Sequence, residues 1–277
     1  MKAPRDPGGV KELQRRLNRL AADTGSTVRR LQSLVANVVV CQMLPGSAVK
    51  GGTGIKLRLG DILTRQTPDL DTAFRGDLDA FEDALRKSLA AGWGHFTGGV
   101  TRGVQRPPGG VPAPYVMQPF TVKLQYHHRS FATVDVEVGY DELEATSEPP
   151  ELQLSSEVLD AFARLGLDAP APVAVLPLHH QISQKLHACT EPGNERAHDL
   201  VDLQLVAPLA DDALVADTVQ RLFRFRAQHR WPAAVITGPT WASLYADGAE
   251  GLDVLPTLEE AVNWVNSEYI PRLAAHT

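Results

Sequence analysis

Two short stretches, Lys50-Gly51-Gly52-Thr53 and Thr67-Pro68-Asp69-Leu70-Asp71, carry most of the information in this chain. Side chains two positions apart in a strand point to the same face, so Asp69 and Asp71 place their carboxylates close together. Two like charges at that spacing are destabilising unless a cation neutralises them, and hard carboxylate oxygens suit Mg²⁺. The upstream glycines leave room for a phosphate and offer bare backbone N–H groups. Together the stretches predict a metal-dependent site for a nucleoside triphosphate; the alternative is a surface turn after Pro68.

Composition is that of an ordinary globular protein. The 277 residues are 43% hydrophobic and 22% charged, which is enough to form a core and one or two domains. No apolar run approaches the roughly 20 residues that cross a bilayer, and residues 1–7 lack the apolar segment of a signal peptide. We therefore expect a cytoplasmic protein with no membrane partner, in which Cys41 and Cys189 stay reduced.

Charge is distributed unevenly along the chain. Residues 1–65 contain twelve Lys/Arg and four Asp/Glu, whereas the whole chain has a net charge of −6. A basic N-terminal region suits phosphates or an RNA backbone. Its arginines on two expected helices are candidates for that contact: Arg15, Arg16, Arg19, Arg29 and Arg30. The alternative is a solvated pair of amphipathic helices that needs no partner.

Hydrophobic periodicity predicts both helices and strands. Apolar residues at helical spacing predict helices over 11–22, 26–43 (with Ser26 as N-cap), 77–91, 181–188, 197–206, 212–228 and 258–273. Alternation predicts strands over 120–126 and 130–138, and a short apolar run predicts another over 173–176. Glycine and proline predict a loop over 97–114. Residues 49–59 fit a short helix or a strand.

Further candidates for chemistry lie downstream. Asp135 and Glu137 share the face opposite the valines of their strand, so Asp135 is a third carboxylate for a cation site. Lys185 lies beside the apolar face of its helix, where it could neutralise triphosphate charge. Asp199 and Asp202 share one face of the next helix at i, i+3, so an ion-pair lock with Lys185 is the structural alternative.

The histidines do not predict a zinc site. His180 and His187 lie about 10.5 Å apart along a helix, which is too far to share one ion without other ligands. His127 and His128 face opposite sides of a strand. Neither a nucleophile elbow nor a P-loop lysine motif occurs, so the serine hydrolase and Walker-type NTPase classes lack support.

In order along the chain, these motifs resemble the AbiEii family of nucleotidyltransferase toxins, whose mycobacterial relatives are called MenT. The resemblance covers roughly residues 48–206 and rests on five motifs: Gly51-Gly52-Thr53, Asp69-Leu70-Asp71, Val134-Asp135-Val136, Gln184-Lys185-Leu186-His187-Ala188 and His198-Asp199-Leu200-Val201-Asp202. Gln184 stands where the family has glutamate, and His198 stands where it has arginine.

The resemblance implies an α+β protein with a polymerase-β-like nucleotidyltransferase lobe, assigned to residues 1–150, and a mainly helical lobe, assigned to residues 151–277. It also implies an NTP-dependent toxin with a possible cognate antitoxin, which transfers nucleotides to RNA, above all to the tRNA 3′ acceptor end. The implied metal ligands for Mg²⁺ are Asp69, Asp71 and Asp135. Gly51, Gly52 and Thr53 would hold the phosphates, Lys185 would contact the triphosphate, and Asp199 would orient Lys185.

Two other functions stay open. The same site could nucleotidylate a protein or a small molecule, or the lobe could be a non-catalytic module that binds an antitoxin or RNA. Three aspartates together with Lys185 argue against the non-catalytic module.

Overall fold

The computed structural model describes residues 6–105 and 116–276, which form two compact units. The first unit holds the described residues up to Ile62 together with Gln66–Asp141 and Pro149–Val175. The second holds Leu63–Arg65, Glu142–Glu148 and the chain from Leu176 onward. Residues 149–175 therefore group with the first unit, whereas the family resemblance implied a lobe boundary at residue 150.

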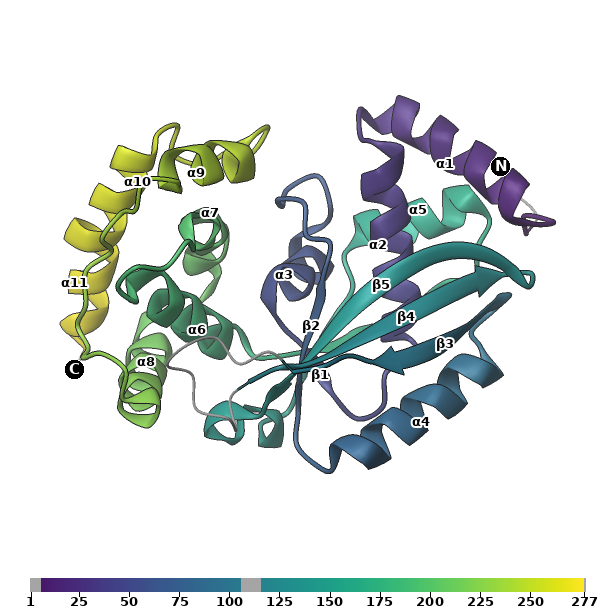
Figure 1. Ribbon diagram of the computed structural model, residues 1–277. Coiled ribbons are helices and arrows are strands. Elements are labelled where there is room, and N and C mark those ends of the chain that lie inside the picture. The colour runs from purple at the N-terminus through teal and green to yellow at the C-terminus, as the bar shows by residue number, and fades with distance from the viewer. Residues whose placement is uncertain (1–5, 106–115, 277) are drawn as a thin grey trace. The chain divides into compact units, whose positions relative to one another are not determined.

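The first unit is built on one mixed sheet (Figure 1). Within the described residues its seven strands run in the order β3-β4-β5-β2-β1-β7-β6. The pairs β2/β5 and β1/β7 are parallel and the other neighbours are antiparallel. The strands are β1 (Ala48–Val49), β2 (Leu70–Phe74), β3 (Phe96–Arg102), β4 (Gln118–Tyr126), β5 (Arg129–Tyr140), β6 (Glu151–Gln153) and β7 (Val173–Val175).

Five helices belong to the described part of this unit, and α2 packs on β5 while α4 runs along β3 (Figure 1). They are α1 (Val10–Thr24), α2 (Val28–Cys41), α3 (Gly51–Leu59), α4 (Leu78–Ala91) and α5 (Ser156–Leu165). The N-cap of α2 is Thr27, whose hydroxyl accepts the backbone N–H of Arg30, so the expectation of Ser26 was wrong. Asp77 caps α4 in the same way, through the N–H of Ala80.

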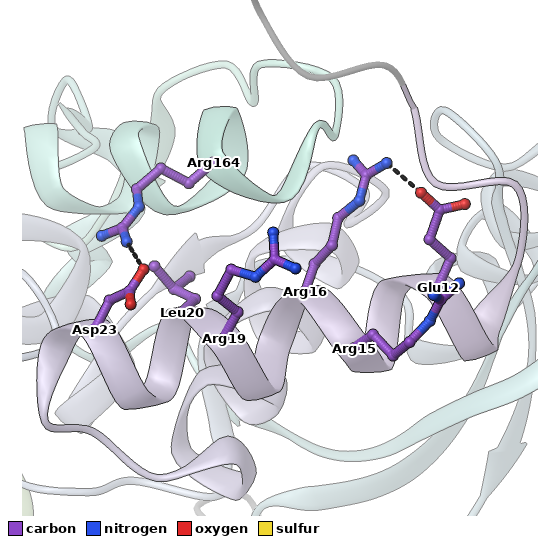
Figure 2. A pocket seen from close by; sticks show the side chains of 7 residues that line it. All are labelled: Glu12, Arg15, Arg16, Arg19, Leu20, Asp23 and Arg164. Carbon is purple, nitrogen blue, oxygen red and sulfur yellow. Dashed lines mark hydrogen bonds and ion pairs between the residues drawn. The ribbon is translucent and has the colours of Figure 1, made fainter.

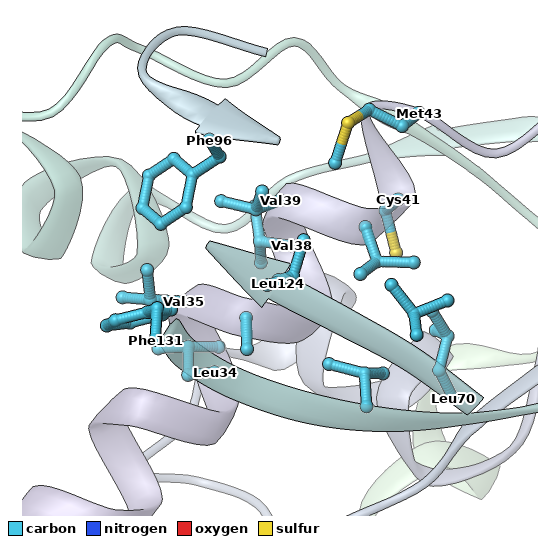
Figure 3. Close-up of a cluster of buried hydrophobic side chains, with 14 of the residues drawn as sticks. Leu34, Val35, Val38, Val39, Cys41, Met43, Leu70, Phe96, Leu124 and Phe131 are labelled. Carbon is cyan, nitrogen blue, oxygen red and sulfur yellow. The ribbon is translucent and has the colours of Figure 1, made fainter. Parts of the chain in front are cut away.

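The core of the first unit lies between α2 and the sheet (Figure 3). Val35 and Val39 of α2 are fully buried, and Leu70 of β2 and Leu124 of β4 are buried in the same cluster. Burying each such side chain contributes about 1.5–3 kcal/mol relative to leaving it in water. This packing fixes which face of β2 and β5 points inward, and therefore which face presents the carboxylates.

One loop expectation was wrong in part. Residues 96–102 form β3, which pairs with β4 from Phe96↔Tyr126 to Arg102↔Phe120, because backbone pairing tolerates the two glycines of this strand. Residues 106–114 of the expected loop lie outside the described residues.

The second unit is mainly helical. Its helices are α6 (Leu178–Thr190), α7 (Ala197–Val206), α8 (Asp212–Arg226), α9 (Trp241–Ala249), α10 (Leu258–Trp264) and α11 (Ile270–Ala274). Helix α6 packs on α8 and α7 packs on α9. The mixed sheet and the helical unit confirm the α+β fold class. Among the described residues, no helix combines the length and apolarity needed to cross a membrane.

Candidate functional site

The glycine turn forms the beginning of α3. Gly51 has φ +62°, a left-handed conformation that glycine adopts without strain, and it follows directly after the N-cap Lys50. The first N–H groups of a helix have no intrahelical partner, and the helix dipole places partial positive charge there. The turn therefore offers Gly51, Gly52 and Thr53 amides to an anion.

The turn lies directly against the D-x-D pair. The Lys50 N–H donates to the Asp71 carbonyl at 2.9 Å, and the Thr53 hydroxyl donates to the Asp69 carbonyl at 2.8 Å. A Cβ atom on Gly51 would lie 2.2 Å from Asp71 Oδ2, so the carboxylate occupies the space that a side chain would need. The structure thus brings together two motifs that are sixteen residues apart.

The third aspartate lies on the neighbouring parallel strand. Leu70 of β2 is in register with Val136 of β5, and Asp71 is in register with Glu137. Paired residues of parallel strands share a face, so Asp71, Glu137 and Asp135 lie on the face opposite the buried valines. Thr121 of β4 donates its hydroxyl to Asp135 Oδ1 at 3.1 Å and so restrains that carboxylate.

This face fits a divalent cation in its donor chemistry. Asp69 and Asp135 are exposed, and Asp71 is half-buried, so their carboxylates face solvent beside a helix N-terminus. Oxygen donors of this kind suit Mg²⁺, which keeps several water ligands and binds through a few carboxylates plus phosphate. Glu137, which the sequence pattern indicated only as part of the strand face, lies nearest to Asp71 in register.

Lys185 belongs to the second unit, where it is the centre of a buried ionic network. It is 5% exposed, and its Nζ donates to Asp199 Oδ1 at 2.8 Å and to Asp202 Oδ2 at 2.6 Å. Burial alone would lower the pKa of Lys185, but the two carboxylates outweigh burial and raise that pKa above its ordinary value. The predicted pairing of Lys185 with Asp199 and Asp202 is therefore present.

Two arginines that the sequence pattern did not single out complete the network. Arg65 places Nε and Nη2 on the Asp202 carboxylate at 2.9–3.1 Å, and Arg196 Nε donates to Asp199 Oδ2 at 2.8 Å. Burial works against ionisation of Asp199, but Lys185 and Arg196 hold its pKa well below the usual range. The position of Arg196 three residues before Asp199 was the available signal for this pair.

The two departures from the family motifs each have a local partner. Burial lowers the pKa of His198 to about 4, so His198 adds no charge near neutral pH, and Arg196 supplies the guanidinium to Asp199 instead. Gln184 donates its amide N–H to Glu142 Oε2 at 3.0 Å. Glu142 also binds Arg226 through two bonds of 2.7 Å.

The structure thus sorts the predicted residues into two sets. Gly51, Gly52, Thr53, Asp69, Asp71 and Asp135 lie in the first unit, and Lys185 and Asp199 lie in the second. In the first set, hydrogen bonds join the glycine turn to Asp69 and Asp71, and strand register places Asp135 on the same face. In the second set, Lys185 binds Asp199 directly.

The basic N-terminal residues form a pocket of about 370 Å³ where α1 meets α5 (Figure 2). Its basic side chains are Arg15, Arg16, Arg19 and Arg164, and it also contains Glu12 and Asp23. Arg16 donates to the Leu165 carbonyl at 2.7 Å and Arg164 pairs with Asp23 at 2.6 Å, so both are held in place.

Arg30 does not take part in this pocket. Its Nε binds the buried Asp61 at 2.7 Å, which makes it a structural residue of the first unit. The expectation that Arg30 is available for RNA is therefore not supported by its position.

The chain is similar to known proteins in its sequence family and in its fold. Residues 39–265 match the family model described as nucleotidyl transferase AbiEii toxin, type IV TA system. MenT4, a nucleotidyltransferase toxin from Mycobacterium tuberculosis H37Rv, is similar in structure with a TM-score of 0.51 at 17% identity, over 88% of this chain and 92% of that one. JHP933 from Helicobacter pylori gives a TM-score of 0.42 at 15% identity, over 88% and 87% of the two chains. No curated protein matches this chain in sequence.

The family match over residues 39–265 defines a nucleotidyltransferase, and the fold is similar to that of MenT4. The chain belongs to the AbiEii family of nucleotidyltransferase toxins of type IV toxin–antitoxin systems.

The contact between Gly51 and Asp71 can be tested with Gly51→Ala. The new Cβ would lie 2.2 Å from Asp71 Oδ2, and overpacking of this kind costs about 1–3 kcal/mol. Gly25→Ala is the matched control, because Gly25 has φ +68° and no atom within 4 Å of its Cβ position. We expect urea unfolding to show a larger loss of stability for Gly51→Ala than for Gly25→Ala. Equal losses would mean that backbone conformation alone accounts for the glycine.

The ionic network can be tested with Lys185→Met, which leaves Asp199 and Asp202 buried without their shared cation. Breaking a buried pair in this way costs about 3–5 kcal/mol, whereas an exposed pair contributes about 0–1 kcal/mol. Arg221→Met is the control, because Arg221 and Asp217 form an exposed pair on α8. Chemical unfolding should show a large loss for Lys185→Met and almost none for Arg221→Met. A small loss for both would contradict a stabilising role.

Proposed function

We propose that this protein transfers nucleotides from an NTP to RNA, above all to the tRNA 3′ acceptor end, in a reaction that depends on Mg²⁺. The observation that carries the proposal is the meeting of three features on one face: the α3 N-terminus, the Asp69–Asp71 pair and Asp135 on the adjacent parallel strand. Membership of the nucleotidyltransferase family supports the reaction class.

The phosphate contacts are assigned to the backbone of the turn. The amides of Gly51, Gly52 and Thr53 would donate to β- and γ-phosphate oxygens at the positive end of the α3 dipole. The Thr53 side chain has another task, since its hydroxyl donates to the Asp69 carbonyl and so positions the first aspartate.

Asp69, Asp71 and Asp135 would hold Mg²⁺, which when bound neutralises triphosphate charge and stabilises the leaving pyrophosphate. In the reaction, the acceptor hydroxyl oxygen forms a bond to the α-phosphorus, and the bond from that phosphorus to the bridging oxygen of pyrophosphate breaks. Asp135 is proposed to accept the hydroxyl proton, with Thr121 holding one of its oxygens in place.

Lys185 is proposed to contact the triphosphate. An ammonium group has three N–H donors, and two of them bind Asp199 and Asp202, so the third remains for a phosphate oxygen. Asp199 orients Lys185 in this account. If the folded Lys185→Met variant keeps full NTP affinity, Lys185 has only its role in the ionic network.

The pocket of Arg15, Arg16, Arg19 and Arg164 is proposed to hold the RNA backbone. Guanidinium groups bind phosphate through paired N–H bonds, and Arg16 and Arg164 are already fixed by Leu165 and Asp23. A cognate antitoxin and a cytoplasmic location are proposed on the basis of the family.

The acceptor class and the acidic site can be tested together. Protein incubated with Mg²⁺ and α-labelled NTPs in the presence of total RNA and total protein should label RNA. We expect Asp69→Asn and Asp71→Asn to abolish labelling with little loss of thermal stability, because both side chains lie outside the core. Asp83→Asn, an exposed change on α4, is the control and should label normally.

Two results would contradict this proposal. Labelling of protein or of a small molecule instead of RNA would favour the alternative enzyme. Labelling that persists in both aspartate variants would place the chemistry elsewhere.

The RNA pocket leads to a separate prediction about salt. We expect the affinity for RNA to fall steeply with salt, and Arg15→Gln with Arg19→Gln to reduce the slope of log affinity against log salt by about 0.7–0.9 for each RNA phosphate that the variant no longer neutralises. Arg86→Gln on α4 is the control, because Arg86 pairs with Glu82 on the exposed surface. NTP affinity should not change. An unchanged slope in the double variant would show that RNA binds elsewhere.

A further inference from the structure

A second cluster of metal-binding side chains lies within the second unit. Glu148, His179 and His180 bring their ligand atoms within 4.8 Å of one another. Glu148 Oε2 lies 3.1 Å from His179 Nε2, and Glu148 Oε1 lies 2.9 Å from His180 Nε2. The sequence pattern paired His180 with His187 and so did not reveal this cluster.

The rings of His179 and His180 point at the same carboxylate, although adjacent residues of a helix ordinarily point in different directions. Adjacent helical residues point about 100° apart, yet both Nε2 atoms reach one carboxylate and the ring centroids are 4.3 Å apart. His179 is 7% exposed and His180 is 3% exposed. Two imidazole nitrogens and one carboxylate at these separations are three ligand atoms that one cation can share.

Proton positions around His179 strengthen this argument. Thr218 donates its one hydroxyl proton to the Leu214 carbonyl at 2.8 Å, and that oxygen can only accept. The 2.8 Å contact between Thr218 Oγ1 and His179 Nδ1 therefore requires a proton on Nδ1. With that proton on Nδ1, the neutral ring offers Nε2, on the side of Glu148, as the ligand atom for a metal ion.

We propose that Glu148, His179 and His180 bind a Zn²⁺ ion. Two imidazoles and a carboxylate form a ligand set that zinc uses, with nitrogen and oxygen ligands at about 2.0–2.2 Å. Ligands at that distance in a tetrahedron lie about 3.3 Å apart, close to the two separations in this cluster. Thr218 fixes the tautomer of His179, as an outer partner of a ligating histidine does.

The side chain of Glu148 is 41% exposed, so the site has an open side for water and an entry path for the ion. An ion bound there ties the segment before residue 149 to α6 and α8, two helices that lie side by side (Figure 1). It would therefore stabilise the helix that carries Lys185.

Zinc binding by the full-length protein tests the proposal. Protein stripped with a chelator is titrated with ZnCl₂ while excess Mg²⁺ is present to fill the cation site proposed in the first unit. The stoichiometry of zinc binding and the melting temperature are measured. We expect one zinc ion per chain, a raised melting temperature, and at least about tenfold weaker binding in Glu148→Gln and in His180→Asn. Thr218→Val, which removes only the outer partner, should weaken binding by about tenfold to a hundredfold.

The other cluster of metal-binding side chains supplies the control. Asp6, His95 and His127 also lie close together, but in the first unit, so His95→Asn with His127→Asn should leave the high-affinity zinc unchanged. Circular dichroism checks that each variant is folded, and Glu148→Gln is the mildest because its side chain is partly exposed. Absence of saturable zinc binding, equal binding in Glu148→Gln and His180→Asn, or loss of binding only in the His95 and His127 variant would each overturn the proposal.

Discussion

The candidate site of the first unit depends on the close contact between the Gly51 turn and strand β2. Two bonds, from the Lys50 N–H to the Asp71 carbonyl and from the Thr53 hydroxyl to the Asp69 carbonyl, hold the start of α3 against the D-x-D pair. The missing side chain of Gly51 leaves the space that Asp71 Oδ2 fills. One backbone constraint therefore places a helix N-terminus beside a carboxylate, which is the combination that the proposed site for a metal-bound triphosphate requires.

The second unit contains a buried ionic network. Lys185, Asp199 and Asp202 are all buried, and taking such charges out of water costs several kcal/mol per ion. Two partly exposed arginines offset this cost. Arg65 binds the Asp202 carboxylate and Arg196 binds the Asp199 carboxylate. The two carboxylates therefore keep Lys185 charged and fix the direction of its ammonium group.

Local patterns in the sequence predicted much of this structure. The periodicity of residues 11–22 and 77–91 predicted helices α1 and α4 nearly to their ends, because each buries one regular apolar stripe. The same periodicity did not reveal α5 and α9, and the glycines of β3 indicated a loop because glycine signals turns more often than strands. For the site, the motif order grouped the aspartates, but the register of Asp71 with Glu137 and the guanidinium of Arg65 depend on tertiary contacts. No local pattern encodes those contacts.

At the two positions where this chain departs from the family motifs, the contacts of the folded protein explain which residue is found. A glutamate at position 184 would face Glu142, which Arg226 already neutralises, and a second carboxylate there would be repulsive. Glutamine donates an N–H to Glu142 instead and keeps α6 tied to this segment. Likewise the ionic network of Lys185 tolerates a histidine at position 198, because Arg196 already donates from its guanidinium to the Asp199 carboxylate. Each of the two positions is thus accommodated by a contact within the second unit, through Glu142 for Gln184 and through the Arg196–Asp199 pair for His198.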